Sequence, residues 1–162
     1  TPRVTTPSTT AASVPSSAEP APYVNSAWLT EGARVLLVED NPVNVLVAEA
    51  MLRNLGYEVF TVTDGRQAVA WLENDQCDVV LMDCAMPVMD GFEATRQIRQ
   101  REGQTGRTRV PIVALTANVL SDERSLCLEV GMDDHLAKPF ESDDLRRVVQ
   151  RCMTNAPLLR VL

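Results

Sequence analysis

The sequence lacks the features of a membrane-spanning, a secreted or a zinc-binding protein. No apolar run approaches the roughly 18–20 residues that a membrane helix needs, and the N-terminus shows no signal-peptide pattern. There are four cysteines but no C-x-x-C pair, and only one histidine could join them. A zinc site is therefore not expected, and we predict buried free thiols in a reducing compartment.

Positive charge is also scarce. The chain has 22 acidic against 15 basic side chains, a net charge of −7. A general binder of phosphate backbones needs an excess of positive charge, so we expect no nucleic-acid partner and no membrane contact by this segment. The length of 162 residues allows one domain with a tail. Because the chain begins with Thr1 rather than methionine, we expect it to be part of a longer protein.

The first thirty residues differ in composition from the rest. Pro, Ser, Thr and Ala supply 21 of them, and five of the ten prolines lie here. Such a segment cannot bury enough apolar surface to offset the entropy lost on ordering. We therefore predict a disordered linker over residues 1–32, a folded domain over 33–156 and a C-terminal tail over 157–162.

Beyond the linker, short apolar runs alternate with helical patterns. The runs predict five strands, over residues 34–38, 57–62, 78–82, 111–115 and 135–137. Helices are predicted from residue 42, from 65, over 91–100, over 120–130 and from 142, with a polar loop over 101–109. Strands joined by crossover helices form a parallel sheet with helices on both faces, so we predict a doubly wound α/β fold.

Polar side chains stand where four of these strands end. The first strand runs into Glu39 and Asp40, the third into Asp83, the fourth into Thr116 and the fifth into Lys138. Ligands of open parallel sheets bind at this edge. Three carboxylates there would repel one another by roughly 4 kcal/mol per pair at about 4 Å. A hard divalent cation such as Mg²⁺ would compensate, whereas the alternative is a set of solvated strand-end acids.

With these residues in view, the chain resembles the receiver domain of two-component response regulators. The similar segments are VLLVEDNPVN (35–44), VVLMDCAMPVMDGFEATRQIR (79–99), PIVALTAN (111–118) and GMDDHLAKPF (131–140). The resemblance implies a flavodoxin-like sheet with strand order 2-1-3-4-5 and five helices. It is strongest to receivers of hybrid sensor histidine kinases, which implies a cytoplasmic location, within the cytoplasmic part of a membrane-anchored kinase.

The resemblance also implies a phosphoacceptor and a metal site. Asp83 would take a phosphoryl group from the phosphohistidine domain of a histidine kinase or from a histidine phosphotransfer protein. Mg²⁺ would be held by Glu39, Asp40, Asp83 and the backbone carbonyl of Ala85. The domain would thus catalyse its own phosphorylation and dephosphorylation rather than turn over a substrate.

Further residues match the family's phosphoryl-binding and switch positions. Lys138, Thr116 and the backbone N–H of Ala117 would contact the phosphoryl oxygens. Thr116 and His135 would form the conformational switch, and the bond between Lys138 and Pro139 is expected to be cis.

Three other functions fit parts of the pattern. A Mg²⁺-dependent phosphatase of the haloacid-dehalogenase kind also uses Asp, Thr and Lys, but usually carries a second acid where this chain has Ala85. A flavodoxin needs a Ser/Thr/Gly-rich phosphate loop where this chain has Glu39 and Asp40. A receiver that works only as a docking surface is the third alternative.

Overall fold

The computed structural model describes residues 32–117 and 121–161. Residues 1–31, most of the predicted linker, lie outside this part of the chain, as does the predicted helix start at Leu120. The strands are β1 (Arg34–Val38), β2 (Glu58–Val62), β3 (Val79–Asp83), β4 (Ile112–Thr116) and β5 (Asp134–Ala137). The helices are α2 (Pro42–Asn54), α3 (Gly65–Asn74), α4 (Gly91–Thr105), α5 (Ser121–Val130) and α6 (Ser142–Val161). Each predicted strand is confirmed to within one residue at either end.

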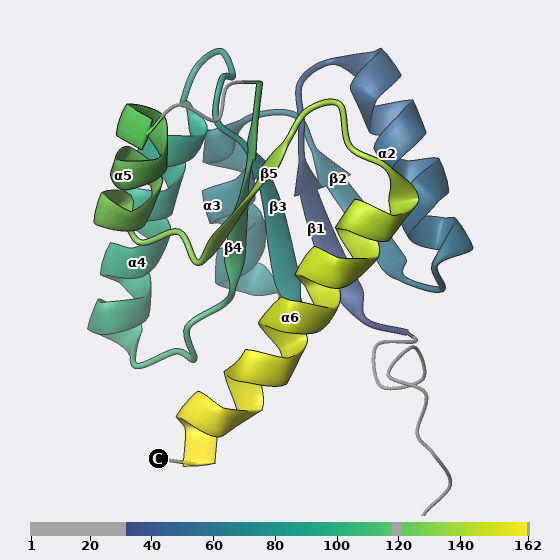
Figure 1. Ribbon diagram of the computed structural model, residues 1–162. Helices are drawn as coiled ribbons and strands as arrows, with labels where there is room; N and C mark the ends of the chain where they lie inside the picture. Colours follow the sequence, from purple (N-terminus) through teal and green to yellow (C-terminus); the bar gives the residue numbers. More distant parts are fainter. Residues whose placement is uncertain (1–31, 118–120, 162) are drawn as a thin grey trace, which may run out of the picture.

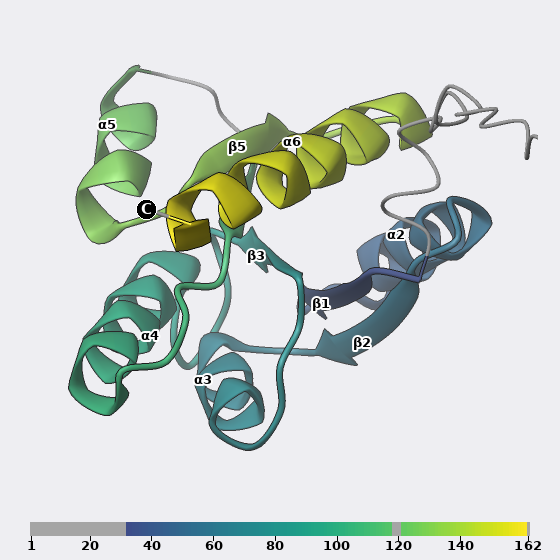
Figure 2. The same ribbon diagram turned by 90° about the horizontal axis from the view of Figure 1, so that it is seen from below.

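The five strands form one parallel sheet in the order β2-β1-β3-β4-β5, as the resemblance implied. Helices α2 and α6 cover one face of the sheet, and α3, α4 and α5 cover the other (Figures 1 and 2). Alternate residues of each strand point to opposite faces. In β1, for example, Val35 and Leu37 pack beneath α2 and α6, while Leu36 and Val38 join the core beneath α3 to α5.

The start of α4 lies directly against the end of β3. Asp90 caps this helix, since its side chain accepts a hydrogen bond from the Glu93 backbone N–H at 2.8 Å. A Cβ atom at Gly91 would lie 2.4 Å from the backbone oxygen of Asp83, so only glycine fits there. The Gly91 N–H also donates to the Cys84 carbonyl at 3.2 Å. The Asp90-Gly91 pair therefore fixes the loop that follows Asp83.

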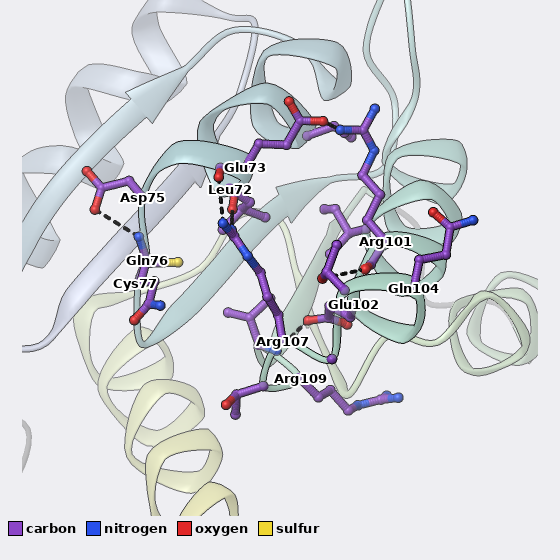
Figure 3. Close-up of a pocket in the computed structure, with 16 residues that line it drawn as sticks. Leu72, Glu73, Asp75, Gln76, Cys77, Arg101, Glu102, Gln104, Arg107 and Arg109 are labelled. Atoms are coloured by element: carbon purple, nitrogen blue, oxygen red, sulfur yellow. Dashed lines mark hydrogen bonds and ion pairs between the residues drawn. The ribbon is translucent and has the colours of Figure 1, made fainter.

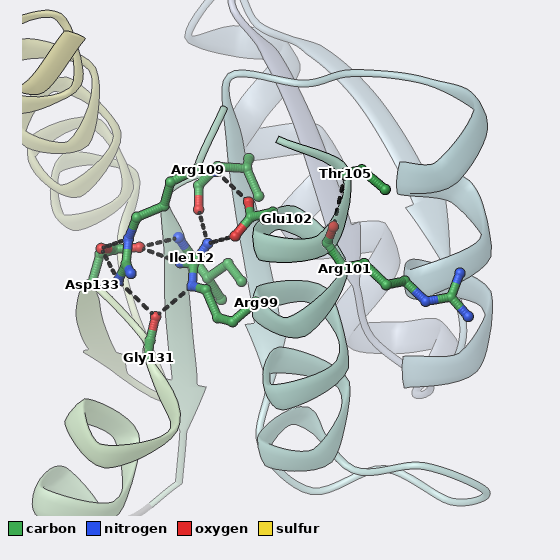
Figure 4. A network of polar contacts seen from close by, with 9 residues as sticks. Arg99, Arg101, Glu102, Thr105, Arg109, Ile112, Gly131 and Asp133 are labelled. Atoms are coloured by element: carbon green, nitrogen blue, oxygen red, sulfur yellow. Dashed lines mark hydrogen bonds and ion pairs between the residues drawn. The ribbon is translucent and has the colours of Figure 1, made fainter. Parts of the chain in front are cut away.

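The predicted loop over residues 101–109 is partly wrong, because α4 continues through its first half. Glu102, in the added turn, accepts hydrogen bonds from the Arg99 guanidinium and from the Val110 backbone N–H, both at 2.7 Å (Figure 4). Gly106 then ends the helix in the left-handed conformation, with φ of 69°. The added turn contains no apolar side chain, so hydrophobic periodicity could not reveal it.

Helix α6 also runs further than its apolar pattern indicated. It continues to Val161, so residues 157–161 of the predicted tail are helical. In Figure 1 its C-terminal part extends past the edge of the sheet. Among the described residues, no helix is both long enough and apolar enough to span a membrane.

Candidate functional site

Three acidic side chains meet at the carboxyl ends of β1 and β3, which are paired neighbours in the sheet. Carboxylate oxygens of Glu39, Asp40 and Asp83 lie within 4.8 Å of one another. Glu39 and Asp83 are buried, whereas Asp40 is exposed. We call this set the acidic cluster. An all-oxygen donor set of this kind, open to water on one side, suits a hard divalent cation.

Lys138 reaches the acidic cluster from the end of β5. Its Nζ lies 2.7 Å from Glu39 Oε2 and 3.3 Å from Asp83 Oδ2. Its backbone N–H donates to the Thr116 carbonyl at 2.8 Å, and its peptide bond to Pro139 is cis, as expected. It is the only lysine in the chain.

Burial and the charge of Lys138 shift the pKa values of the buried carboxylates in opposite directions. Burial raises the pKa of Asp83 to about 6, although Lys138 and the Ala85 N–H oppose this shift. Glu39 is also desolvated, but hydrogen bonds from Lys138 and from the Asn41 N–H outweigh this and lower its pKa. The two carboxylates in turn keep the pKa of Lys138 raised despite its own burial. At neutral pH, Asp83 is therefore mainly an anion beside a cation.

The beginning of α2 holds Glu39 in place. Asn41 caps this helix, accepting from the Val43 N–H at 2.9 Å, and this turn brings the Asn41 N–H back to Glu39 Oε1 at 3.2 Å. The side-chain amide of Asn44 donates to the same oxygen at 3.4 Å. The sequence E-D-N-P-V-N thus both starts a helix and orients a buried carboxylate.

Thr116 lies at the end of β4 and is buried. Its hydroxyl donates a hydrogen bond to Glu123 Oε1 at 2.8 Å. Glu123 was missed by sequence reasoning, because it stands in the first turn of α5 rather than at the end of a strand. The sequence did offer one indication of this contact, because the helix that follows the Thr116 strand has an acidic residue in its first turn.

The remaining predicted residues lie around the cluster or apart from it. The Ala85 N–H donates to Asp83 Oδ1 at 3.2 Å, and Ala117 follows directly after β4. His135 is half-buried on β5, paired in register with Ala114, and does not belong to the acidic cluster.

A cavity of about 770 Å³ lies on the side of the sheet where the strands begin, away from the acidic cluster. It is situated between the C-terminal ends of α3 and α4 (Figure 3). Arg107 crosses it and donates to the backbone carbonyls of Leu72 and of Glu73, the latter at 2.7 Å. The guanidinium thereby satisfies carbonyl groups at the end of α3. This cavity is distant from the acidic cluster and takes no part in its chemistry.

Residues 35–150 match the model of the response regulator receiver domain. The chain belongs to this family. It is a receiver domain of the two-component type, homologous to those of hybrid sensor histidine kinases.

Two curated relatives illustrate the relationship. The sensor protein GacS of Pseudomonas syringae pv. syringae is 44% identical over 116 residues, which cover 72% of this chain and 13% of GacS. Probable histidine kinase 6 of Oryza sativa subsp. japonica is 39% identical over 136 residues, covering 74% of this chain and 14% of the kinase. The chain therefore spans a small part of the length of these relatives.

Two solved structures share the fold. One is the receiver domain of a sensor histidine kinase from Pseudomonas aeruginosa PAO1, with a magnesium ion coordinated in its active site cleft. It is 54% identical, with a TM-score of 0.69 over 76% of this chain and 98% of that one. The other is the receiver domain of the Saccharomyces cerevisiae response regulator Ssk1, in complex with the histidine phosphotransfer protein Ypd1. It has 30% identity and a TM-score of 0.72 over 78% and 92% of the two chains.

Proposed function

We propose that Asp83 is the phosphoacceptor of a histidine-to-aspartate phosphorelay and that its phosphorylation switches the conformation of the domain. The observation that carries this proposal is the position of Asp83. Its ionised carboxylate lies in the acidic cluster, with Lys138 Nζ 3.3 Å away. A nucleophile, a cation and two further acids are thus assembled at the sheet edge where ligands bind.

In the transfer step, an Asp83 carboxylate oxygen attacks the phosphorus of a phosphohistidine. The nitrogen–phosphorus bond breaks, the imidazole leaves with its electron pair, and an acyl phosphate forms on Asp83. Lys138, already within ion-pair distance of Asp83, is placed to contact one phosphoryl oxygen. The Thr116 hydroxyl and the Ala117 N–H would contact the others.

The acidic cluster fits a magnesium ion. Its donors are all oxygens, and Lys138 supplies one positive charge against three carboxylates. Glu39, Asp40, Asp83 and the backbone carbonyl of Ala85 would hold the ion, with Glu39 acting through water. When bound, Mg²⁺ supplies positive charge to the oxygens of the transferred group. The magnesium in the Pseudomonas aeruginosa receiver supports this assignment.

An apolar surface next to the cluster suits docking of the phosphodonor. Val43, Leu46 and Val47 on α2 are 67%, 70% and 47% exposed. Their i, i+3 and i+4 spacing places them on one face of the helix, beginning three residues after Asp40. We assign this face to a histidine phosphotransfer protein or to the phosphohistidine domain of a kinase. The complex of the Ssk1 receiver with Ypd1 supports such a partner.

The switch would involve Thr116 and His135. Thr116 would turn toward the phosphoryl group, and the half-buried His135 ring on the neighbouring strand would follow. In the whole protein the domain would form part of a hybrid histidine kinase, on the cytoplasmic side of the membrane.

The proposal is tested with acetyl phosphate, a small phosphodonor, in the presence of Mg²⁺ and with intact-mass detection. One added phosphate is the expected result. Steady release of phosphate without an adduct would favour the phosphatase alternative. If the experiment shows neither an adduct nor release of phosphate, the remaining alternative is a domain that works only by docking.

A further inference from the structure

The Thr116 hydroxyl is engaged by an acidic side chain from the neighbouring helix. Its Oγ1 lies 2.8 Å from Glu123 Oε1, with Thr116 buried and Glu123 half-buried. Glu123 stands in the first turn of α5, beside the exposed Asp122. The contact thus joins the end of β4, a strand that contributes to the site, to the beginning of a helix.

The charge of Glu123 also affects the pKa of Cys84, the residue that follows β3. Burial raises the pKa of Cys84, and the neighbouring Cys127 and the Glu123 carboxylate raise it further. Cys84 directly follows Asp83 and donates its backbone N–H to Leu115 in β4 at 3.1 Å. Glu123 therefore contacts the end of β4 directly and also acts electrostatically on the residue after β3.

We propose that Glu123 is a positioning residue that holds the Thr116 hydroxyl in the unphosphorylated domain and competes for it with the phosphoryl group on Asp83. This inference rests on the proposed function. A hydroxyl has a single hydrogen to donate. Donation to a phosphoryl oxygen therefore requires that the bond to Glu123 be given up.

Phosphorylation would act on Glu123 in two ways. The phosphoryl group withdraws the hydroxyl, and the acyl phosphate, with a charge of about −1.5 to −2 at pH 7, is more negative than the Asp83 carboxylate that it replaces and so repels the Glu123 carboxylate more strongly. Because Glu123 belongs to α5, both effects act on the first turn of that helix. Glu123 thereby makes the resting arrangement more stable and raises the threshold for switching.

The test is a titration of the full chain with beryllofluoride, a phosphoryl mimic, in Mg²⁺ and followed by NMR amide shifts. We expect Glu123→Ala to bind the mimic about tenfold more tightly, which corresponds to about 1.4 kcal/mol. Glu123→Gln keeps an acceptor oxygen but removes the charge, so its affinity should be intermediate. Asp122→Ala is the matched control. It removes the same charge from the same turn, and its affinity should stay within about twofold of wild type.

A double-mutant cycle separates this role from a general effect on the fold. In a Thr116→Val background no hydroxyl remains and only the charge of Glu123 acts, so adding Glu123→Ala should raise the affinity by about threefold instead of about tenfold. If Glu123→Ala does not fold, Glu123→Gln takes its place in the cycle.

Four results would overturn the inference. Three of them would remove the role of Glu123 but leave the proposed function intact. These are wild-type affinity in both Glu123 variants, an equal gain in affinity in Asp122→Ala, and an undiminished gain in the Thr116→Val background. Failure of the wild-type domain to bind beryllofluoride in Mg²⁺ would instead remove the proposed function, and the role of Glu123 with it.

Discussion

Asp83 is subject to two opposing influences, its burial and the charge of Lys138. Burial prevails, so its pKa rises to about 6, yet at neutral pH the carboxylate is still mainly ionised. A poorly hydrated anion that keeps its charge is a better nucleophile than a carboxylate at the surface. The buried position at the end of β3 therefore makes the carboxylate more reactive, and its ionisation there lowers the stability of the fold.

Substituting Asp83 by Asn should abolish phosphorylation while the fold is kept. The change is nearly isosteric and removes the nucleophilic charge. We expect no mass increase with acetyl phosphate and Mg²⁺, against one phosphate on the wild-type chain. Asp122→Asn, at an exposed position of α5, is the control and should be modified normally. Uptake by Asp83→Asn at the wild-type rate would disprove the assignment.

Ionisation of Asp83 should weaken the fold as pH rises. The folded pKa of about 6 lies above the ordinary value of 3.8, so the native state keeps this proton to a higher pH than the unfolded chain. The free energy of unfolding therefore falls between about pH 4 and pH 6 and stays lower above this window. In metal-free buffer, wild type should lose roughly 1 kcal/mol more than Asp83→Asn between pH 5 and 7.5. Urea denaturation measures the difference, and parallel curves would contradict it.

At the scale of elements, a polar network joins the end of α4 to the turn between α5 and β5 (Figure 4). The Arg99 guanidinium donates to Glu102 Oε1 and to Asp133 Oδ2 at 2.7 Å each, and to the Gly131 carbonyl at 2.9 Å. The Asp133 carboxylate also accepts from the Ile112 N–H, at 2.9 Å, where β4 begins. Three elements are thus tied together at the edge of the sheet opposite the acidic cluster.

Removal of Arg99 should therefore destabilise the domain. Its side chain is 13% exposed, so Arg99→Ala would leave partly buried acceptors without a donor. We expect a loss of about 3 kcal/mol in urea denaturation. Arg96→Ala is the control on the same helix, because Arg96 forms an exposed i, i+3 pair with Glu93 and should cost less than about 0.5 kcal/mol. Equal losses would show that the network contributes little.

Local sequence patterns predicted the strands and most of the site, but not the polar contacts of this network. The five strands were predictable because their apolar runs are local and are bounded by turn residues. The polar residues Glu39, Asp83 and Lys138 were predictable for a similar reason, since each directly follows or ends such a run. The last turn of α4 is held instead by polar contacts, such as the hydrogen bond from the Val110 N–H to Glu102, which apolar periodicity does not reveal. Glu123 was missed because its partner lies on another element.

At the scale of the whole molecule, the sheet separates two apolar cores. One lies beneath α2 and α6, and the other beneath α3, α4 and α5. The strand ends between them carry the acidic cluster, whose three negative charges repel one another and are offset only in part by Lys138. Binding of a cation at this edge is therefore linked to the stability of the whole domain.

Mg²⁺ should consequently raise the melting temperature. A ligand that binds only the native state adds about 2.7 kcal/mol at a hundredfold excess over its Kd, which corresponds to roughly 8 °C for a domain of this size. The shift should shrink in Asp40→Asn, whose exposed side chain can be changed without disturbing the core. Asp122→Asn should show the full shift. A melting temperature that does not change across a Mg²⁺ titration would rule out a metal site in the acidic cluster.

The single lysine has a consequence for covalent modification. Acylation directed at lysine side chains can modify this sequence at one position only, Lys138. The acylated nitrogen would carry no charge, so Glu39 and Asp83 would lose the cation that they share. Lysine acylation of this domain would therefore act on the proposed phosphorylation chemistry itself.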